Sequence, residues 1–265
     1  MIYTRLLRAM LRARYGEPPE TPSGEGAGLV LMADGVGGLD LCGTALRYVA
    51  AAEGLPHEVR ILNWGHGFGR WHADLTNVPN HEAKSAVIAA ELAVLREQRA
   101  GAPSFLVGKS GGTGLVVRAL EALPARSVEA VVLISPALSP EYDLSAALRA
   151  VQREMVVFWS PLDLVVLGLG TRIFGTVDRV NSVSAGLVGF RPPGGSGAAA
   201  PPEYARLRQV RWQPEMASTG YFGGHVGPDS PAFLRKYVLP LLTVGGASNA
   251  DSSTGSSPRP NAPIT

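Results

Sequence analysis

Ser110 lies in the stretch LVGKSGGTGL (residues 106–115), where an apolar run meets a serine flanked by glycines. The residues before it predict a strand and those after it predict a helix, so Ser110 occupies a strand-to-helix turn. Gly108 and Gly112 lack the Cβ atoms that would collide in such a turn, which also contains Lys109. The Gly111 N–H, at the start of the helix, would face an oxyanion formed beside the serine. This pattern predicts a nucleophilic serine.

A serine hydroxyl is a poor nucleophile until a base takes its proton, so the hypothesis requires a histidine that can reach Ser110. His225 is the candidate among the five histidines, because it lies in YFGGHVGPDS between the last predicted strand and the last predicted helix. Two preceding glycines leave this loop free to turn inward. His57 and His81 begin a predicted strand and a predicted helix, and we interpret both as ordinary polar positions.

The histidine in turn needs an acid that holds its tautomer and stabilises its positive charge. Asp163, in VVFWSPLDLVV, follows an apolar strand within a few residues, which places it at the same carboxyl edge as the serine. Asp178, in IFGTVDRV, is the alternative acid, and its other interpretation is a surface ion pair with Arg172 or Arg179. With Asp163 as the acid, the order along the chain is Ser, Asp, His.

The elements that must position these residues alternate along the chain. We predict strands at 28–34, 57–64, 103–109, 129–135, 154–160 and 206–213. We predict helices at 40–53, 81–99, 111–123 and 140–152, with a final amphipathic helix that begins at Pro231. Strands that alternate with helices indicate βαβ units and a mostly parallel sheet. One α/β domain over residues 28–244 accounts for the pattern.

This layout resembles the α/β-hydrolase superfamily of serine hydrolases, in particular its esterases and lipases, over roughly residues 28–242. The resemblance implies a mostly parallel sheet flanked by helices and a second oxyanion donor in the loop after an early strand. By position, that loop is LVLMADGVGGLDL and the donor is the Val36 N–H. Asp34 stands where many members have histidine. Because a carboxylate facing the oxyanion would oppose its charge, we expect Asp34 to turn away and accept backbone N–H bonds.

Two further differences from the family bear on the site. Lys109 stands beside the serine where many members have histidine or aspartate. About 15 residues separate the strand region that ends near 138 from the strand that begins near 154, which leaves no room for a large cap between the strands after the nucleophile. The longer segment 164–204 is therefore the candidate for a cover over the pocket.

Composition argues against several other classes of protein. A net charge of +2 without a run of Lys or Arg makes a nucleic-acid partner unexpected. Cys42, the only cysteine, allows no internal disulfide and is predicted to be buried on a helix. The sequence GKSGG resembles the end of a phosphate loop, but the upstream glycine of that motif is absent. We expect no cofactor.

One stretch, NWGHGFGRWHADL, raises the question of a metal ion. Its spacing matches no strong ligand pattern, so we expect no metal, and a metal site there stays the alternative. The candidate ligands would be His66, His72 and Asp74.

The ends of the chain differ from its middle. Residues 1–15 predict an amphipathic helix that arginines interrupt, followed by a linker to residue 27, and we interpret the helix as docked on the domain. Weak contact of this helix with a membrane or lipid interface is the alternative. With no recognisable signal peptide, we expect a cytoplasmic location.

Residues 191–202 are predicted to form a flexible loop, and residues 245–265 a disordered tail.

Together these features predict a carboxylesterase that cleaves small-molecule esters through an acyl-enzyme intermediate. Its catalytic residues would be Ser110, Asp163 and His225, with the amides of Val36 and Gly111 as oxyanion donors. A lipase that acts at an interface is the nearest alternative, and an amidase or peptidase is less favoured. A non-catalytic binding protein of the same fold is the alternative from another class.

Overall fold

The computed structural model describes residues 2–17, 27–194 and 199–245. Six parallel strands form one sheet in the order β2-β1-β3-β4-β5-β6. The strands are β1 (Leu29–Ala33), β2 (Glu58–Ile61), β3 (Ser104–Lys109), β4 (Val128–Ile134), β5 (Val151–Trp159) and β6 (Leu207–Arg211). The prediction of an α/β fold with a mostly parallel sheet is confirmed.

The central strands are apolar on both faces because helices cover both sides of the sheet. In β3, Phe105 and Val107 point into one hydrophobic core, and Leu106 points into the other. In β4, Val131 and Leu133 belong to the same core as Leu106. This period of two decides on which side of the sheet each residue at a strand's end will lie.

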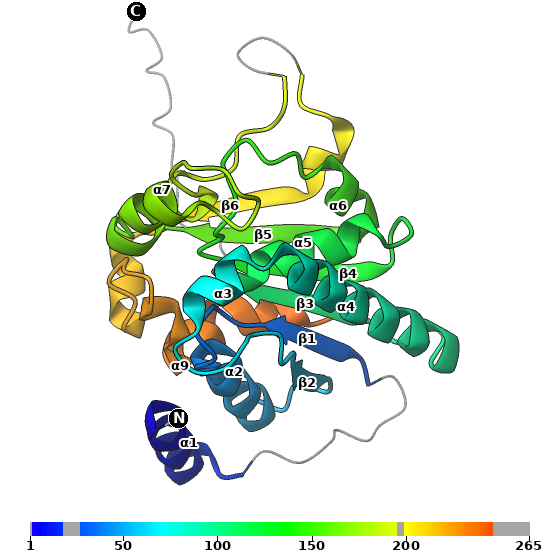
Figure 1. Cartoon of the computed structure of the whole chain (residues 1–265). Coiled ribbons are helices and arrows are strands. Elements are labelled where there is room, and N and C mark those ends of the chain that lie inside the picture. Colours follow the sequence, from blue (N-terminus) through cyan, green and yellow to red (C-terminus); the bar gives the residue numbers. More distant parts are fainter. Residues whose placement is uncertain (1, 18–26, 195–198, 246–265) are drawn as a thin grey trace, which may run out of the picture.

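Helices of the two layers fill the cores (Figure 1). On the side of Leu106 lie α4 (Val78–Gln98), α5 (Gly112–Glu121) and α6 (Ser145–Ala150). On the side of Phe105 lie α1 (Ile2–Tyr15), α2 (Leu41–Ala52) and a C-terminal helical segment of three turns with different geometries. That segment consists of α9 (Pro231–Phe233), η5 (Leu234–Val238) and η6 (Leu239–Leu242).

Several predicted boundaries differ from the observed ones. The predicted helix 140–152 is wrong over half its length, because only α6 is helical there and β5 already begins at Val151. Residues 71–76 form α3 (Trp71–Thr76), a short helix that was not predicted. Part of the predicted loop 191–202, and all but the first residue of the predicted tail, lie outside the described residues.

The carboxyl ends of the strands, where the candidate site residues lie, form one edge of the sheet. The connection from β4 to β5 holds only α6 and short turns, so no large cap is inserted there. After β5 the chain forms η1 (Val165–Gly170), α7 (Thr171–Phe174) and α8 (Ala185–Val188) before η2 (Pro202–Arg206) leads into β6. Within the described ranges, no helix is long and apolar enough to cross a membrane.

Candidate active site

Ser110 occupies a strained turn between β3 and α5. Its φ angle is +50°, in the left-handed region that residues with a side chain seldom adopt. The turn is fixed because the Ser110 N–H continues the sheet by donating to the Ile134 carbonyl, at 2.9 Å. Gly112 lies so close to β1 that a Cβ atom there would be 2.2 Å from the Ala33 carbonyl oxygen. The sequence LVGKSGGTGL therefore folds into a sharp turn that places the Ser110 side chain at the edge of the sheet.

His225 bridges Ser110 and Asp163. The His225 Nε2 atom lies 2.9 Å from Ser110 Oγ, and its Nδ1 atom lies 2.6 Å from Asp163 Oδ2. A carboxylate only accepts hydrogen bonds, so Nδ1 carries the proton and Nε2 is free to accept the serine proton. The Asp163 side chain is 3% exposed and that of His225 16%, so the pair is largely shielded from water.

Asp163 lies in the turn that follows β5, and its position is set by the backbone there. Its N–H donates to the Ser160 carbonyl at 3.2 Å, and the Ser160 hydroxyl accepts from the Leu162 N–H at 3.2 Å. Asp178, the alternative acid, instead accepts from the N–H of Ser139 at 2.9 Å and from its hydroxyl at 2.5 Å. The interpretation of Asp178 as a surface partner of an arginine is wrong, and it makes no contact with His225.

The loop that carries His225 is anchored at Tyr221. The Tyr221 ring is buried against Phe233, with ring centroids 5.0 Å apart, and its carbonyl accepts from Trp212 Nε1 at 2.8 Å. Burial raises the pKa of the Tyr221 hydroxyl to about 12, so it stays neutral. Gly223 has a φ angle of +86°, and a Cβ there would lie 2.6 Å from Leu162. These constraints direct the histidine toward the serine.

Two backbone amides lie beside Ser110 and are suited to hold an oxyanion. A Cβ atom on Gly111 would lie 2.6 Å from Val36 Cγ1, and one on Gly35 would lie 3.5 Å from Ser110 Cβ, so the loop after β1 packs directly on the serine turn. Among the described residues, the N–H groups of Val36 and Gly111 donate to no other group. Unpaired amides beside a nucleophile can receive a developing negative charge.

Two buried carboxylates shape this loop. Asp34 turns away from the serine and accepts from the N–H groups of Gly35 at 2.8 Å and Gly43 at 2.7 Å. Asp74, which is fully buried, accepts from the Gly37 N–H at 2.7 Å and the His66 N–H at 2.6 Å. Asp74 thus ties the loop after β1 to the loop after β2, a role that its position in the sequence did not reveal.

Lys109 forms a buried ion pair directly beneath the serine turn. Its Nζ atom lies 2.6 Å from Asp229 Oδ1, and the two side chains are 6% and 12% exposed. Burial alone would lower the pKa of Lys109, but the carboxylates of Asp229 and Asp34 raise it to about 12. Burial raises the pKa of Asp229 by more than the Lys109 charge lowers it. The pair joins the residue before Ser110 to the turn just after His225.

The two histidines that suggested a metal site have different partners. His66 Nδ1 pairs with Asp74 Oδ1 at 2.9 Å, whereas the His72 ring packs edge-on against Trp71 and Phe174. Within the described part of the chain, no group of three His, Cys, Asp or Glu side chains is arranged to hold a metal ion. His81 is fully buried, with Nε2 2.5 Å from the Asp74 carbonyl, so it is a core residue.

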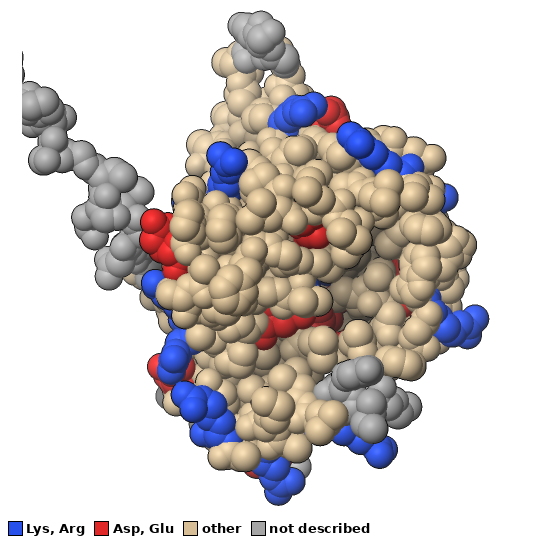
Figure 2. All heavy atoms as spheres, turned by 90° about the vertical axis from the view of Figure 1, so that its left-hand side faces the viewer, with Lys and Arg blue, Asp and Glu red and all other residues tan. Residues whose placement is uncertain are grey.

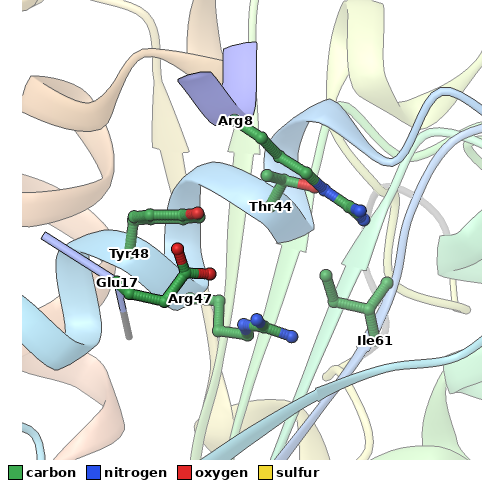
Figure 3. A pocket seen from close by; sticks show the side chains of 6 residues that line it. All are labelled: Arg8, Glu17, Thr44, Arg47, Tyr48 and Ile61. Atoms are coloured by element: carbon green, nitrogen blue, oxygen red, sulfur yellow. The ribbon is translucent and has the colours of Figure 1, made fainter. Parts of the chain in front are cut away.

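The surface on this side of the molecule is hollowed and mostly uncharged. Figure 2 shows acidic side chains within the hollow and basic side chains around the periphery. A separate cavity of about 100 Å³ lies between α1 and α2 and does not include the candidate catalytic side chains. Its lining includes Arg8, Glu17, Thr44, Arg47, Tyr48 and Ile61 (Figure 3).

The sheet order, the strained serine turn and the order Ser, Asp, His together define the α/β-hydrolase fold. No family model and no curated protein matches the sequence.

Solved structures with similar architecture include a protein described as a predicted CIB-like hydrolase from Thermoplasma acidophilum (14% identity, 83% of this chain and 88% of that one, TM-score 0.44). They also include lipase B of Aspergillus fumigatus (13% identity, 80% of this chain and 52% of that one, TM-score 0.46). A third is LpqC, a poly(3-hydroxybutyrate) depolymerase from Bordetella parapertussis (15% identity, 80% of this chain and 80% of that one, TM-score 0.45). Similarity at this distance assigns no activity.

Proposed function

We propose that this protein is a serine hydrolase that cleaves carboxylic esters through an acyl-enzyme intermediate. One observation carries the proposal: the chain of hydrogen-bonding distances from Ser110 Oγ to His225 Nε2 (2.9 Å) and from His225 Nδ1 to Asp163 Oδ2 (2.6 Å). Three side chains from three separate loops meet in this order, so that the histidine can take the serine proton while the aspartate orients the histidine and stabilises its positive charge.

In the first half of the reaction, Ser110 Oγ bonds to the acyl carbon of the ester while its proton passes to His225 Nε2. Asp163 stabilises the imidazolium that forms. The carbonyl oxygen becomes an oxyanion, which the N–H groups of Val36 and Gly111 hold. When the tetrahedral intermediate collapses, the bond to the alcohol oxygen breaks, and His225 returns its proton to the departing alcohol.

In the second half, water takes the place of the alcohol. His225 accepts a proton from the water as its oxygen bonds to the acyl carbon, and the same two amides hold the second oxyanion. Collapse breaks the bond to Ser110 Oγ, which regains its proton from His225 and releases the carboxylic acid. No redox step or external group is required.

A fluorophosphonate probe tests this proposal, since it labels a serine only where a base has activated the hydroxyl. The wild-type protein should be labelled and Ser110→Ala should not. Ser218→Ala is the matched control, because that exposed hydroxyl only donates to the Glu215 carbonyl, and its labelling should equal that of the wild type. Undiminished labelling of Ser110→Ala would remove Ser110 from the role of nucleophile.

The same experiment separates the proposal from a non-catalytic binding protein of this fold, which would give no labelling at all. Substrate preference is measured next. A panel of p-nitrophenyl esters of rising chain length separates an esterase, which prefers short acyl groups, from a lipase, which accepts long ones.

A further inference from the structure

Large apolar side chains are exposed around the mouth of the active site. The most exposed of them lie in three segments, which together we call the rim: residues 68–71, 162–174 and 222–226. Val165 is 78% exposed, Phe222 72%, Val226 68% and Leu169 60%. Scattered apolar side chains are ordinary on a protein surface, but a contiguous group of this kind marks an interaction site.

The three segments of the rim form one continuous surface. The rings of Trp71 and Phe174 are in edge-on contact with centroids 5.0 Å apart, which joins the first segment to the second. Gly223 lies against Leu162, which joins the second segment to the third. The rim also contains Asp163 and His225, so whatever covers it lies over the catalytic side chains.

The charge of the rim indicates the kind of partner. Its exposed ionisable side chains are arginines only, Arg70 and Arg172, and Arg179 is exposed just beyond it. Its one carboxylate, Asp163, is buried and paired with His225. The rim has no exposed acidic side chain, although acidic side chains lie within the hollow that it surrounds (Figure 2), so the rim itself is complementary to an anionic apolar surface.

Helix α1 has the same character and lies on the same side of the molecule (Figure 1). It contains no acidic residue. Leu11 is buried and Leu7 packs beside it on the core under α2, whereas Leu6 and Met10 are exposed. The exposed arginines of this helix are Arg5, Arg8, Arg12 and Arg14, of which Arg12 pairs at 2.9 Å with Glu17, just beyond the end of the helix.

From this arrangement we infer that the rim and α1 dock on a lipid surface with anionic headgroups, with the catalytic serine facing the lipid. The apolar side chains enter the interface and the arginines contact the headgroups. A second copy of the chain fits less well, because pairing two rims would bring arginines against arginines. If the proposed esterase function holds, the docked enzyme takes its ester from the lipid phase.

Vesicle flotation with Ser110→Ala tests docking without hydrolysis of the lipid, so the result does not depend on the proposed activity. The protein is mixed with phosphatidylcholine vesicles or with vesicles of phosphatidylcholine and phosphatidylglycerol at 7:3. We expect it to float with the anionic vesicles, with a partition constant at least about tenfold higher than for neutral ones, and to be partly released by about 0.5 M NaCl.

Two pairs of substitutions in the Ser110→Ala background separate the apolar and the charged contributions. Val165→Ser with Leu169→Ser should weaken partition by roughly tenfold or more, because two side chains no longer enter the interface. The matched control is Val87→Ser with Val94→Ser on α4, which are exposed apolar residues outside the rim.

Arg70→Gln with Arg172→Gln should also weaken partition to anionic vesicles by roughly tenfold, and it should reduce the effect of salt. Its control is Arg96→Gln with Arg99→Gln, at the end of α4. Both control proteins should float like Ser110→Ala. Circular dichroism and thermal unfolding establish that each variant is folded.

Four results would overturn the inference. The first is absence of flotation with the anionic vesicles, and the second is equal flotation with neutral ones. The third is a dimer, detected by sedimentation velocity without lipid, that Val165→Ser with Leu169→Ser abolishes, because the rim would then be a protein interface. Flotation lost equally in the rim variants and their controls would contradict it as well.

Discussion

At the scale of single residues, the site depends on Ser110, whose backbone has an unfavourable φ angle. A non-glycine residue in the left-handed region costs on the order of 1–3 kcal/mol, which the surrounding structure must offset. At Ser110 it does so through the hydrogen bond to Ile134 and the close contact of Gly112 with β1. The strain aims the hydroxyl at His225 rather than along the strand.

The two candidate acids differ in their partners, which leads to a prediction. Asp163→Asn should lower kcat for ester hydrolysis by a factor on the order of ten thousand, because the amide favours the wrong tautomer of His225. Asp178→Asn should leave kcat nearly unchanged, since Asp178 contacts Ser139 instead. Steady-state kinetics of the two variants, both folded by circular dichroism, decide between them. A severe loss only in Asp178→Asn would reverse the assignment.

We also predict that catalysis needs no metal ion, because the proposed nucleophile is generated by proton transfer to His225. Hydrolysis of a p-nitrophenyl ester should survive dialysis against EDTA. A loss of activity that zinc restores, and that His66→Ala makes permanent, would instead identify the residues around Asp74 as ligands.

At the scale of elements, the sequence predicted the inner strands because each contains a short apolar run next to a turn signal, whereas the edge strands β2 and β6 mix apolar with charged or polar residues. The same reasoning failed for residues 140–152, because β5 begins at Val151 with a polar stretch, residues 152–154, before the apolar run that starts at Met155. The C-terminal helix was predicted from its proline and apolar face, but its irregular turns were not, because packing rather than local preference determines them.

The candidate catalytic residues were recognisable because each follows a predicted strand or turn. Their buried supports were not, since Asp74 and Asp229 owe their roles to partners distant in the chain. Lys109 offered one signal: in β3 it shares the side of Phe105 and Val107, which the period of two places in the core under α2. A lysine at such a position requires a buried partner.

This ion pair gives a prediction about stability. Lys109→Met should destabilise the fold by about 3–5 kcal/mol, because it leaves the buried carboxylate of Asp229 without its partner. Lys109→Met with Asp229→Leu should recover much of that loss, since neither charge remains buried. Urea unfolding at pH 7 measures the three proteins. An equal loss in the single and double variants would show that packing, not charge, makes the pair important.

The same pair predicts a dependence on pH. The pKa of Lys109 rises from 10.5 to about 12 in the folded protein, so the Lys109 amine binds its proton more tightly in the folded state than in the unfolded state. Its stabilising contribution is complete below pH 10.5 and is lost as the pH rises through 12. The difference in unfolding free energy between the wild type and Lys109→Met should therefore shrink over that range. A constant difference would contradict the assignment to charge.

At the scale of the whole molecule, the two hydrophobic cores hold the sheet rigid while the loops at its carboxyl edge carry the candidate chemistry. The C-terminal helical segment belongs to the scaffold, because Leu239, Leu241 and Leu242 are buried in the core beneath α2. The residues after it have a different composition, in which Ser, Gly, Pro and Asn dominate and large apolar residues are almost absent. Such a stretch lacks the apolar surface needed to join either core.

The last prediction follows from that contrast. Removal of residues 245–265 should leave the melting temperature and ester hydrolysis almost unchanged, because every core side chain in the described part of the chain lies before residue 245. Removal of residues 239–265 is the control. It also deletes three buried leucines, each worth about 1.5–3 kcal/mol, a sum comparable with the roughly 5–15 kcal/mol that holds a typical domain folded. That protein should unfold or aggregate. A large fall in melting temperature for the first truncation would show that the tail docks on the domain.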